Sequence, residues 1–121
     1  MPNVDQWTRA VQKLVQLTED GKLNWNDSQF PASLREEVLG NAIYGAIVEG
    51  RWVAAYEYRY KSYSDIDTWD WCDEVAIEFV KHNGDLEWRW PTVPYRVQLL
   101  DAIRAKVCGA HDFLKHFLEK A

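Results

Sequence analysis

Long apolar runs, an N-terminal signal and a cysteine framework are all missing from this sequence. No apolar stretch approaches the roughly 20 residues that a helix needs to cross a bilayer. The first residues, MPNVDQWTR, lack the basic and apolar segments of a signal peptide, so we expect a cytoplasmic protein. The two cysteines, Cys72 and Cys108, fit neither a disulfide framework nor a zinc site. We expect both thiols to be reduced and mostly buried, with a bridge between them as the alternative.

Positive charge is scarce as well. The 121 residues include 14 Lys and Arg against 19 Asp and Glu, which gives a net charge of −5. The basic residues are scattered, whereas a nucleic-acid binder needs a basic stripe for its phosphate contacts. The composition therefore argues against nucleic acid and against a membrane as partners. It favours a protein partner that has a basic surface.

Catalytic motifs are absent too. The sequence has no nucleophile motif, no glycine-rich phosphate loop and no HExxH. The histidines His82, His111 and His116 are too few and too scattered for a metal site. Glu78 and Glu87 could approach each other as an acid and base pair, but Arg89 opposite Glu78 favours a structural ladder. We therefore predict no catalytic residue, no metal ion and no cofactor, and the sequence leans against an enzyme.

What the sequence does have is tryptophan, seven in all, and well-defined apolar periodicity. The clearest pattern is residues 75–90, where Asn83-Gly84 predicts a two-residue type I′ turn between two strands. The register of that hairpin sets these residues opposite each other: Glu78 and Arg89, Phe79 and Trp88, Val80 and Glu87. We expect its apolar face to lie on the core and the face that carries Glu78 to be solvated.

A second hairpin is predicted over residues 42–61, with Glu49-Gly50 as its turn. Its register places Ile47 opposite Trp52 and Gly45 opposite Ala54. We expect this face to meet the core, with Gly109 of the last helix approaching Gly45 closely. The other face has few polar side chains, which suggests a homodimer surface on the outer side of the first hairpin, made of Ala42, Tyr44, Ala46, Val48 and Val53.

Helical periodicity accounts for both ends of the chain. Spacings of three and four predict a helix over residues 4–20, capped at Asn3 and ended by Gly21, and a long helix over residues 94–118. A short edge strand at residues 22–25 and a short helix at residues 34–39 are expected between them. The element order predicts one α+β domain over residues 1–121. It consists of a four- to five-stranded antiparallel meander with the N-terminal and C-terminal helices on one face.

The segment of most unusual composition is residues 61–74, which we expect to link the two hairpins. Carboxylates alternate there with large aromatic rings, a combination that suits contact with a basic protein surface. The alternative is a solvated loop whose two tryptophans extend the next strand into the core. The partner-binding hypothesis names Tyr63, Asp65, Asp67, Trp69, Asp70, Trp71 and Asp73.

A pocket is the second hypothesis for a site. Tyr56, Tyr58 and Tyr60 point to one side of the sheet, and tyrosines placed in this way can line a small-molecule pocket between sheet and helices. They are equally typical of core residues whose hydroxyls reach the rim. The sequence as a whole favours a non-enzymatic protein-binding domain of the accessory, immunity or inhibitor-like kind. The alternative is a small-molecule-binding domain or a minor enzyme.

Overall fold

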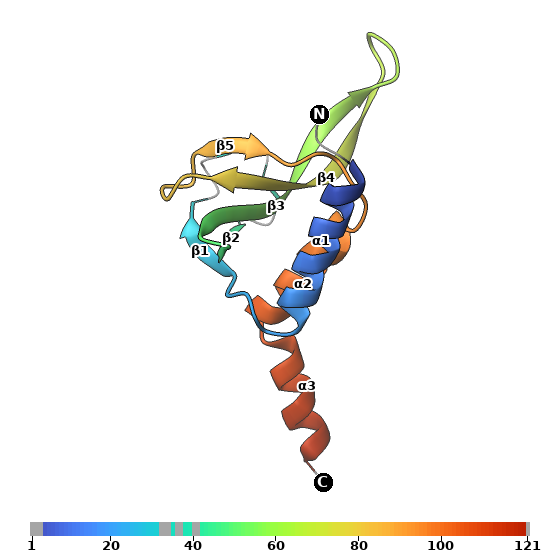
Figure 1. The fold of residues 1–121 in the computed structure, drawn as a ribbon. Coiled ribbons are helices and arrows are strands. Elements are labelled where there is room, and N and C mark those ends of the chain that lie inside the picture. Colours follow the sequence, from blue (N-terminus) through green and yellow to red (C-terminus); the bar gives the residue numbers. More distant parts are fainter. Residues whose placement is uncertain (1–3, 32–34, 36–37, 40–41, 121) are drawn as a thin grey trace.

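The fold is an antiparallel five-stranded sheet with helices at both ends of the chain, as the sequence predicted (Figure 1). The computed structural model describes residues 4–31, 35, 38–39 and 42–120. The strands follow one another in the order β1-β2-β3-β4-β5, with every neighbouring pair antiparallel. The elements are α1 (Val4–Glu19), β1 (Asn26–Phe30), β2 (Ile43–Val48), β3 (Arg51–Tyr63), β4 (Trp69–Val80), β5 (Leu86–Arg89), α2 (Arg96–Val107) and α3 (Ala110–Glu119).

Helix α1 begins and ends close to where its periodicity predicted. Val11, Leu14 and Thr18 form its buried side, and Gly21 takes the left-handed conformation with a φ of 73°. The Gly21 N–H donates to Thr18 O and the Lys22 N–H donates to Leu17 O, which satisfies carbonyls at the end of the helix. The predicted cap at Asn3 lies outside the described residues.

The first strand lies later in the chain than the sequence predicted. Residues 22–25 form a loop, and the edge strand β1 covers Asn26–Phe30 instead. Trp25 belongs to that loop, and its side chain is buried. Its indole N–H donates to the Thr18 hydroxyl at 3.0 Å. The helix predicted over residues 34–39 lies mostly outside the described residues. Val38 and Leu39 are described, and both contact β3 through backbone pairing rather than forming a helix.

The hairpin of β2 and β3 has the predicted turn and register, but the helices cover the face opposite to the predicted one. Glu49 and Gly50 both have positive φ, at 50° and 76°, and Ile47 pairs with Trp52. Helices α1 and α2 lie on the side of Ala46 and Val53, which form one buried cluster with helix residues such as Val11, Leu14, Leu99 and Ile103. The surface suggested for a homodimer is therefore covered by helices.

The opposite face of the hairpin is buried as well, which explains the wrong face assignment. Ala54, Tyr56 and Ala76 belong to a second buried cluster with Phe30, Ile43 and Val80. Every residue from Val53 to Tyr56 is at most 1% exposed. Because both faces are apolar here, alternation along the strand cannot tell which side the helices take.

The hairpin of β4 and β5 keeps most of the predicted register with a different turn. Glu78 pairs with Arg89 and Phe79 with Trp88, but Val80 pairs with Leu86 because the ladder shifts there. The Gly84 N–H donates to Lys81 O, and Gly84 alone takes positive φ in this turn. This is a three-residue loop, because the Lys81 N–H donates to Asp85 O at 2.9 Å and leaves residues 82–84 between them. The Asn83 side chain accepts the Asp85 N–H at 3.0 Å, a bond typical of Asn in turns.

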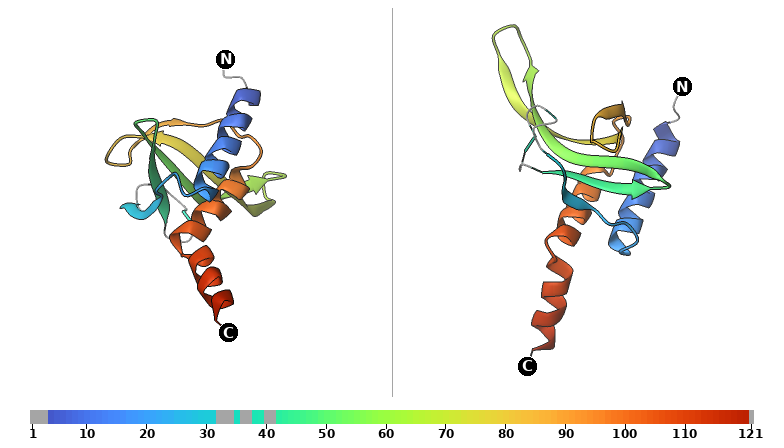
Figure 2. Two further views of the ribbon diagram at one scale, coloured as in Figure 1. Left: turned by 60° about the horizontal axis from the view of Figure 1, so that its bottom comes forward. Right: turned by 90° about the vertical axis from the view of Figure 1, so that its left-hand side faces the viewer.

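The C-terminal helix is broken where a continuous one was predicted. Helix α2 ends at Val107, and Gly109 with a φ of 75° separates it from α3. Helix α3 then runs away from the sheet while α1 and α2 stay on it (Figure 2). A Cβ on Gly109 would meet nothing within 4 Å, so the predicted approach to Gly45 is wrong. Cys72 and Cys108 are free thiols, partly and largely exposed, rather than mostly buried.

Candidate functional site

The segment expected to link the hairpins is itself the end of a long hairpin. Strands β3 and β4 pair without interruption from Val53 and Phe79 to Tyr63 and Trp69. Strand β2 pairs with β3 no farther than Ala55, and β5 pairs with β4 only near its other end. Residues 59–73 therefore form a two-stranded arm, which projects from the body of the molecule in Figure 1.

Alternation along the arm gives it two different faces. Tyr63 pairs with Trp69, Lys61 with Trp71 and Arg59 with Asp73, so these six side chains share one face, called here the aromatic face. The other face carries Tyr60, Ser62, Asp70 and Cys72. Three of the four aromatic rings of the arm, those of Tyr63, Trp69 and Trp71, thus lie on the side of its two basic residues, and Tyr60 lies on the other side.

The rings of the aromatic face are largely exposed and contact one another and Lys61. Trp69 and Trp71 meet edge to face at 5.2 Å, and Lys61 Nζ lies 4.5 Å from the Trp69 ring centroid. Tyr63, Trp69 and Trp71 are 60%, 39% and 45% exposed. Such contacts hold a two-stranded ribbon together, and they leave the outer surface of each ring available.

The tip of the arm, residues 64–68, is a short acidic loop. The Asp65 side chain accepts the Ile66 N–H at 2.7 Å, and the Ser64 N–H donates to Thr68 O at 3.0 Å. The Ile66 side chain is almost fully exposed at this tip. Within the described part of the chain, Asp65, Asp67 and Asp70 form no ion pair, whereas Asp73 pairs with Arg59 at 3.2 Å.

The structure thus brings together some of the predicted site residues and separates others. Tyr63, Trp69 and Trp71 lie side by side, and neither tryptophan enters the core. Asp70 lies on the opposite face, and Asp65 and Asp67 lie at the tip. A role of these residues in binding a partner stays a prediction.

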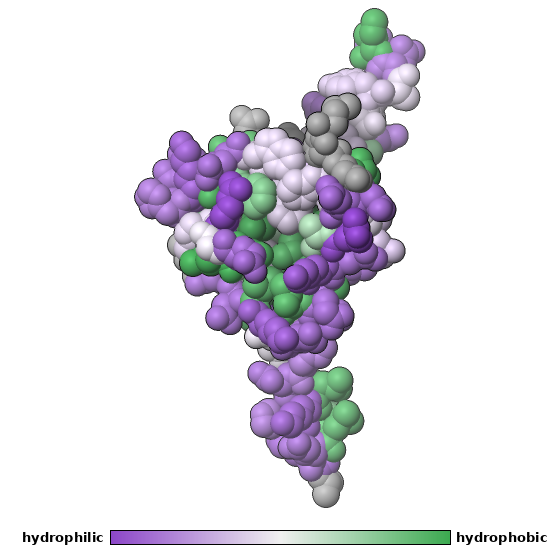
Figure 3. Space-filling model, in the orientation of Figure 1, coloured by the Kyte–Doolittle hydropathy of each residue, from purple (hydrophilic) through white to green (hydrophobic). Residues whose placement is uncertain are grey.

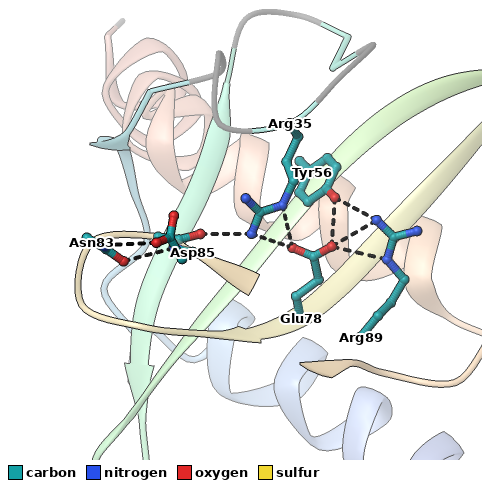
Figure 4. A network of polar contacts seen from close by, with 7 residues as sticks. Arg35, Tyr56, Glu78, Asn83, Asp85 and Arg89 are labelled. Carbon is teal, nitrogen blue, oxygen red and sulfur yellow. Dashed lines mark hydrogen bonds and ion pairs between the residues drawn. The ribbon is translucent and has the colours of Figure 1, made fainter. Parts of the chain in front are cut away.

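The body of the sheet, where Glu78 pairs with Ala54 and Tyr56 with Ala76, contains a buried ionic network that was not predicted (Figure 4). Glu78 was expected on a solvated face, yet its side chain is 0% exposed. Its Oε1 accepts from Arg35 Nε at 3.1 Å, and its Oε2 accepts from Arg89 Nη2 at 2.9 Å. The Tyr56 hydroxyl donates to the same Oε2 at 2.7 Å and accepts from Arg89 Nη2 at 2.9 Å.

The network is anchored in three separate parts of the chain. Arg35 also donates to Gly84 O at 2.8 Å, so one guanidinium joins the segment before β2 to the turn after β4. Burial, and then the Glu78 carboxylate, raises the pKa of Tyr56 to about 12. Because both Glu78 oxygens are occupied by cationic donors and a hydroxyl, this carboxylate is suited to hold the fold together rather than to transfer protons.

The tyrosine row lies on the face that α1 and α2 do not cover. Tyr56 and Tyr58 are 6.2 Å apart between ring centroids, and Tyr58 and Tyr60 are 5.9 Å apart. Arg89 stands 5.2 Å over the Tyr58 ring. A pocket between these tyrosines and the helices is therefore not the arrangement in this fold, and their contact with a small molecule stays a prediction.

A separate pocket of about 630 Å³ lies between the loop after α1, strand β2 and the end of α2. Its walls combine indole rings with charged groups, including Trp25, Asp27, Trp52 and Lys106. Its volume is within the range of small-molecule sites. None of the residues predicted for a site lines it.

Comparison of the chain with protein-family models, curated proteins and solved structures gives no match. Among the described residues, no helix has the length and apolarity that crossing a membrane requires.

Proposed function

We propose that this protein is a non-enzymatic protein-binding domain that contacts its partner with the arm, residues 59–73. The observation that carries the proposal is the aromatic face, where two tryptophans and a tyrosine are exposed at the far end of an ordered hairpin. Large rigid rings lose little conformational entropy on binding, and Trp and Tyr are enriched among the residues that dominate interface energies. A segment that only connects two strands through solvent would not need exposed aromatic rings.

The partner that suits this arm best has a basic surface. Within the arm, Asp73 is neutralised by Arg59, and Lys61 lies against the indole rings. The carboxylates of Asp65 and Asp67 at the tip, and of Asp70 on the other face of the arm, form no ion pair with the described residues and can attract cationic groups of a partner. Charges of one sign at an exposed tip steer a partner of the opposite sign and raise the association rate.

Photo-crosslinking in cells tests the proposal. A photoreactive amino acid at position 63 of the arm is compared with one at position 97, because Val97 is equally exposed but lies on α2. We expect position 63 to give a discrete crosslinked species that excess wild-type protein abolishes and a Trp69→Ser, Trp71→Ser variant does not. Crosslinking of equal yield and identity from both positions would contradict a role of the arm.

The charge component has its own test once the crosslinked partner is purified. Replacing Asp65, Asp67 and Asp70 by Asn should slow association and flatten its salt dependence, with a smaller effect on dissociation. An association rate that these substitutions leave unchanged would remove the basic partner surface from the proposal. The contribution of the aromatic rings would be unaffected by that result.

The pocket beside Trp25 and Trp52 supports the second candidate function, a small-molecule-binding domain. Ligand there would contact both indole rings and change their fluorescence. Titration with a library of small polar aromatic compounds should therefore change the emission of the wild type more than that of a Trp52→Phe variant. Equal responses of both proteins would count against this candidate.

A further inference from the structure

The pocket between the loop after α1, strand β2 and the end of α2 differs in charge from the rest of the protein. Lys22 and Lys106 line it, and Asp27 is the one carboxylate among its described lining residues. Two positive charges against one negative charge leave an excess of one positive charge there. The chain as a whole has a net charge of −5. The pocket is therefore a locally basic site on an acidic protein.

The two lysines come from different elements that lie next to each other. Figures 1 and 2 show the loop after α1 beside the end of α2. The Lys106 Nζ lies 4.0 Å from the point that a Cβ on Gly21 would occupy, and Gly21 directly precedes Lys22. Within the part of the chain that the structure describes, neither lysine forms an ion pair. Both ammonium groups are therefore available to a ligand in the pocket.

Aromatic and aliphatic side chains supply the apolar part of the pocket wall. The Trp25 indole N–H already donates to the Thr18 hydroxyl, so this ring is fixed in place and offers apolar surface. The Trp52 ring packs edge to face against Phe30 at 5.6 Å. Ile47, the cross-strand neighbour of Trp52, is 56% exposed. Fixed rings beside an exposed aliphatic group suit the flat face of an aromatic ligand.

We propose that this pocket binds a small aromatic carboxylate, with its ring against Trp52 and Ile47 and its carboxylate beside Lys22 and Lys106. This inference rests on the second candidate function, because it names the ligand class of the same pocket. An excess of one positive charge matches a carboxylate better than a phosphate monoester, which carries about −1.5 to −2 at pH 7. The pocket volume of about 630 Å³ admits a ligand with one or two rings.

The apolar stripe of helix α3 is a different kind of surface. Its four residues Phe113, Leu114, Phe117 and Leu118 are between 53% and 74% exposed and form a green strip along one side of the helix in Figure 3. The stripe consists of apolar side chains alone. The pocket combines rings with charged groups, and it is such polar groups that orient a small ligand. We therefore assign the aromatic carboxylate to the pocket.

A two-dimensional amide NMR titration with indole-3-acetate and indole-3-acetamide tests this inference. The two probes share a ring system, and only the first is an anion. Each is titrated into the wild type and into a variant with Lys22→Gln and Lys106→Gln. The control variant with Lys13→Gln and Lys115→Gln also removes two exposed positive charges, but neither residue lines the pocket.

We expect indole-3-acetate to shift the side-chain N–H signals of Trp25 and Trp52 in the wild type and to reach saturation. It should bind at least about fivefold more tightly than indole-3-acetamide, because both lysines are exposed and each contributes modestly. The Lys22→Gln, Lys106→Gln variant should bind both probes equally, with the affinity that the wild type has for the amide. The control should keep the preference of the wild type.

Equal affinities of the two probes for the wild type, or a preference that survives the loss of both lysines, would overturn the inference. The pocket would then remain a site for a neutral ligand, and the second candidate function would stand. Lys106 also lies near the C-terminal end of α1, where a cation is favourable. Replacement of both lysines that lowers only the stability in urea, with probe binding unchanged, would assign Lys106 to that role instead.

Failure of the second candidate function gives a different result. If neither probe saturates the wild type, the aromatic carboxylate is excluded. If the library of small polar aromatic compounds then also leaves the Trp52 emission unchanged, the pocket is not a ligand site and both are wrong. The proposal for the arm depends on neither outcome, because the arm lies outside the pocket.

Discussion

Among single residues, Glu78 has the most demanding environment. Its carboxylate is removed from water and surrounded by Arg35, Arg89 and the Tyr56 hydroxyl. Such a group is tolerable only while every partner stays in place, because a single unpaired buried charge costs several kcal/mol. Glu78 therefore links the segment before β2, strand β3 and strand β5 into one unit.

Replacement of Glu78 by Gln should destabilise the protein by about 3 kcal/mol, because two guanidinium groups lose their counter-charge. Urea unfolding followed by tryptophan fluorescence measures the difference. The matched control is Asp73→Asn, which removes an exposed ion pair and should cost less than about 1 kcal/mol. Similar losses in both variants would show that burial of Glu78 contributes nothing.

The titration of Tyr56 gives an independent test of the network. Its pKa is raised from 10.0 to about 12, so the folded state holds this proton more tightly than the unfolded state does. The corresponding stability is fully present below pH 10 and is lost as the pH rises toward 12. Ultraviolet titration of tyrosinate, as the difference between wild type and Tyr56→Phe, should show a group ionising near 12. A difference spectrum with its midpoint near 10 would contradict the buried hydrogen bond.

The sequence predicted part of this site. Register alone paired Glu78 with Arg89, and the structure confirms the pair. The burial of Glu78 was not predictable from the strand pattern, since Arg35 lies 43 residues away and comes from a different segment. A glutamate between Ile77 and Phe79, in a strand with apolar residues on both faces, was the local signal that could have indicated it.

Among the elements, the two turns show what residue pairs can and cannot predict. Glu49-Gly50 was the weaker signal and forms the two-residue turn, whereas Asn83-Gly84 forms a three-residue loop. In the second case Asn83 does not take positive φ, and its side chain bonds to the Asp85 N–H instead. The arm was also missed, because a run of carboxylates suggests a loop, although the cross-strand pairs of Trp69 and Trp71 sustain two strands.

The arm should depend on those cross-strand pairs for its order. Replacing Trp69 and Trp71 by Ser should speed amide hydrogen exchange of Tyr60 and Ser62, whose N–H groups point toward β4, with global stability unchanged to within about 0.5 kcal/mol. The exchange of Ala55 and Ile77 in the buried part of the same strands is the internal control. Equal acceleration at all four amides would mean that the rings support the whole sheet.

At the scale of the whole molecule, a compactly packed body carries two projections, the arm and α3. The body contains both buried clusters, and neither projection contributes a buried residue to them. We therefore separate the residues that stabilise the fold from those that are available for binding. A continuous helix was predicted over residues 94–118 because the apolar spacing continues through Gly109 on the same face. The sequence therefore did not indicate that α3 is separate from the body.

Helix α3 should be dispensable for stability. Replacing Phe113 and Phe117 by Ser should leave the free energy of unfolding of the monomer unchanged to within about 0.5 kcal/mol. The control variant Leu99→Ala, on the buried side of α2, should cost about 2–5 kcal/mol. A large loss in the α3 variant would show that this helix packs on the body in solution.

The affinity of the partner captured from position 63 is the measurement that tests the central claim most directly. Isothermal titration compares wild type, Trp69→Ser with Trp71→Ser, and Val97→Ser as the matched exposed control. Loss of two tryptophans from the centre of an interface should weaken binding by at least about 30-fold, while Val97→Ser should bind like the wild type. Equal affinities for all three proteins would contradict the claim that the arm is the binding surface.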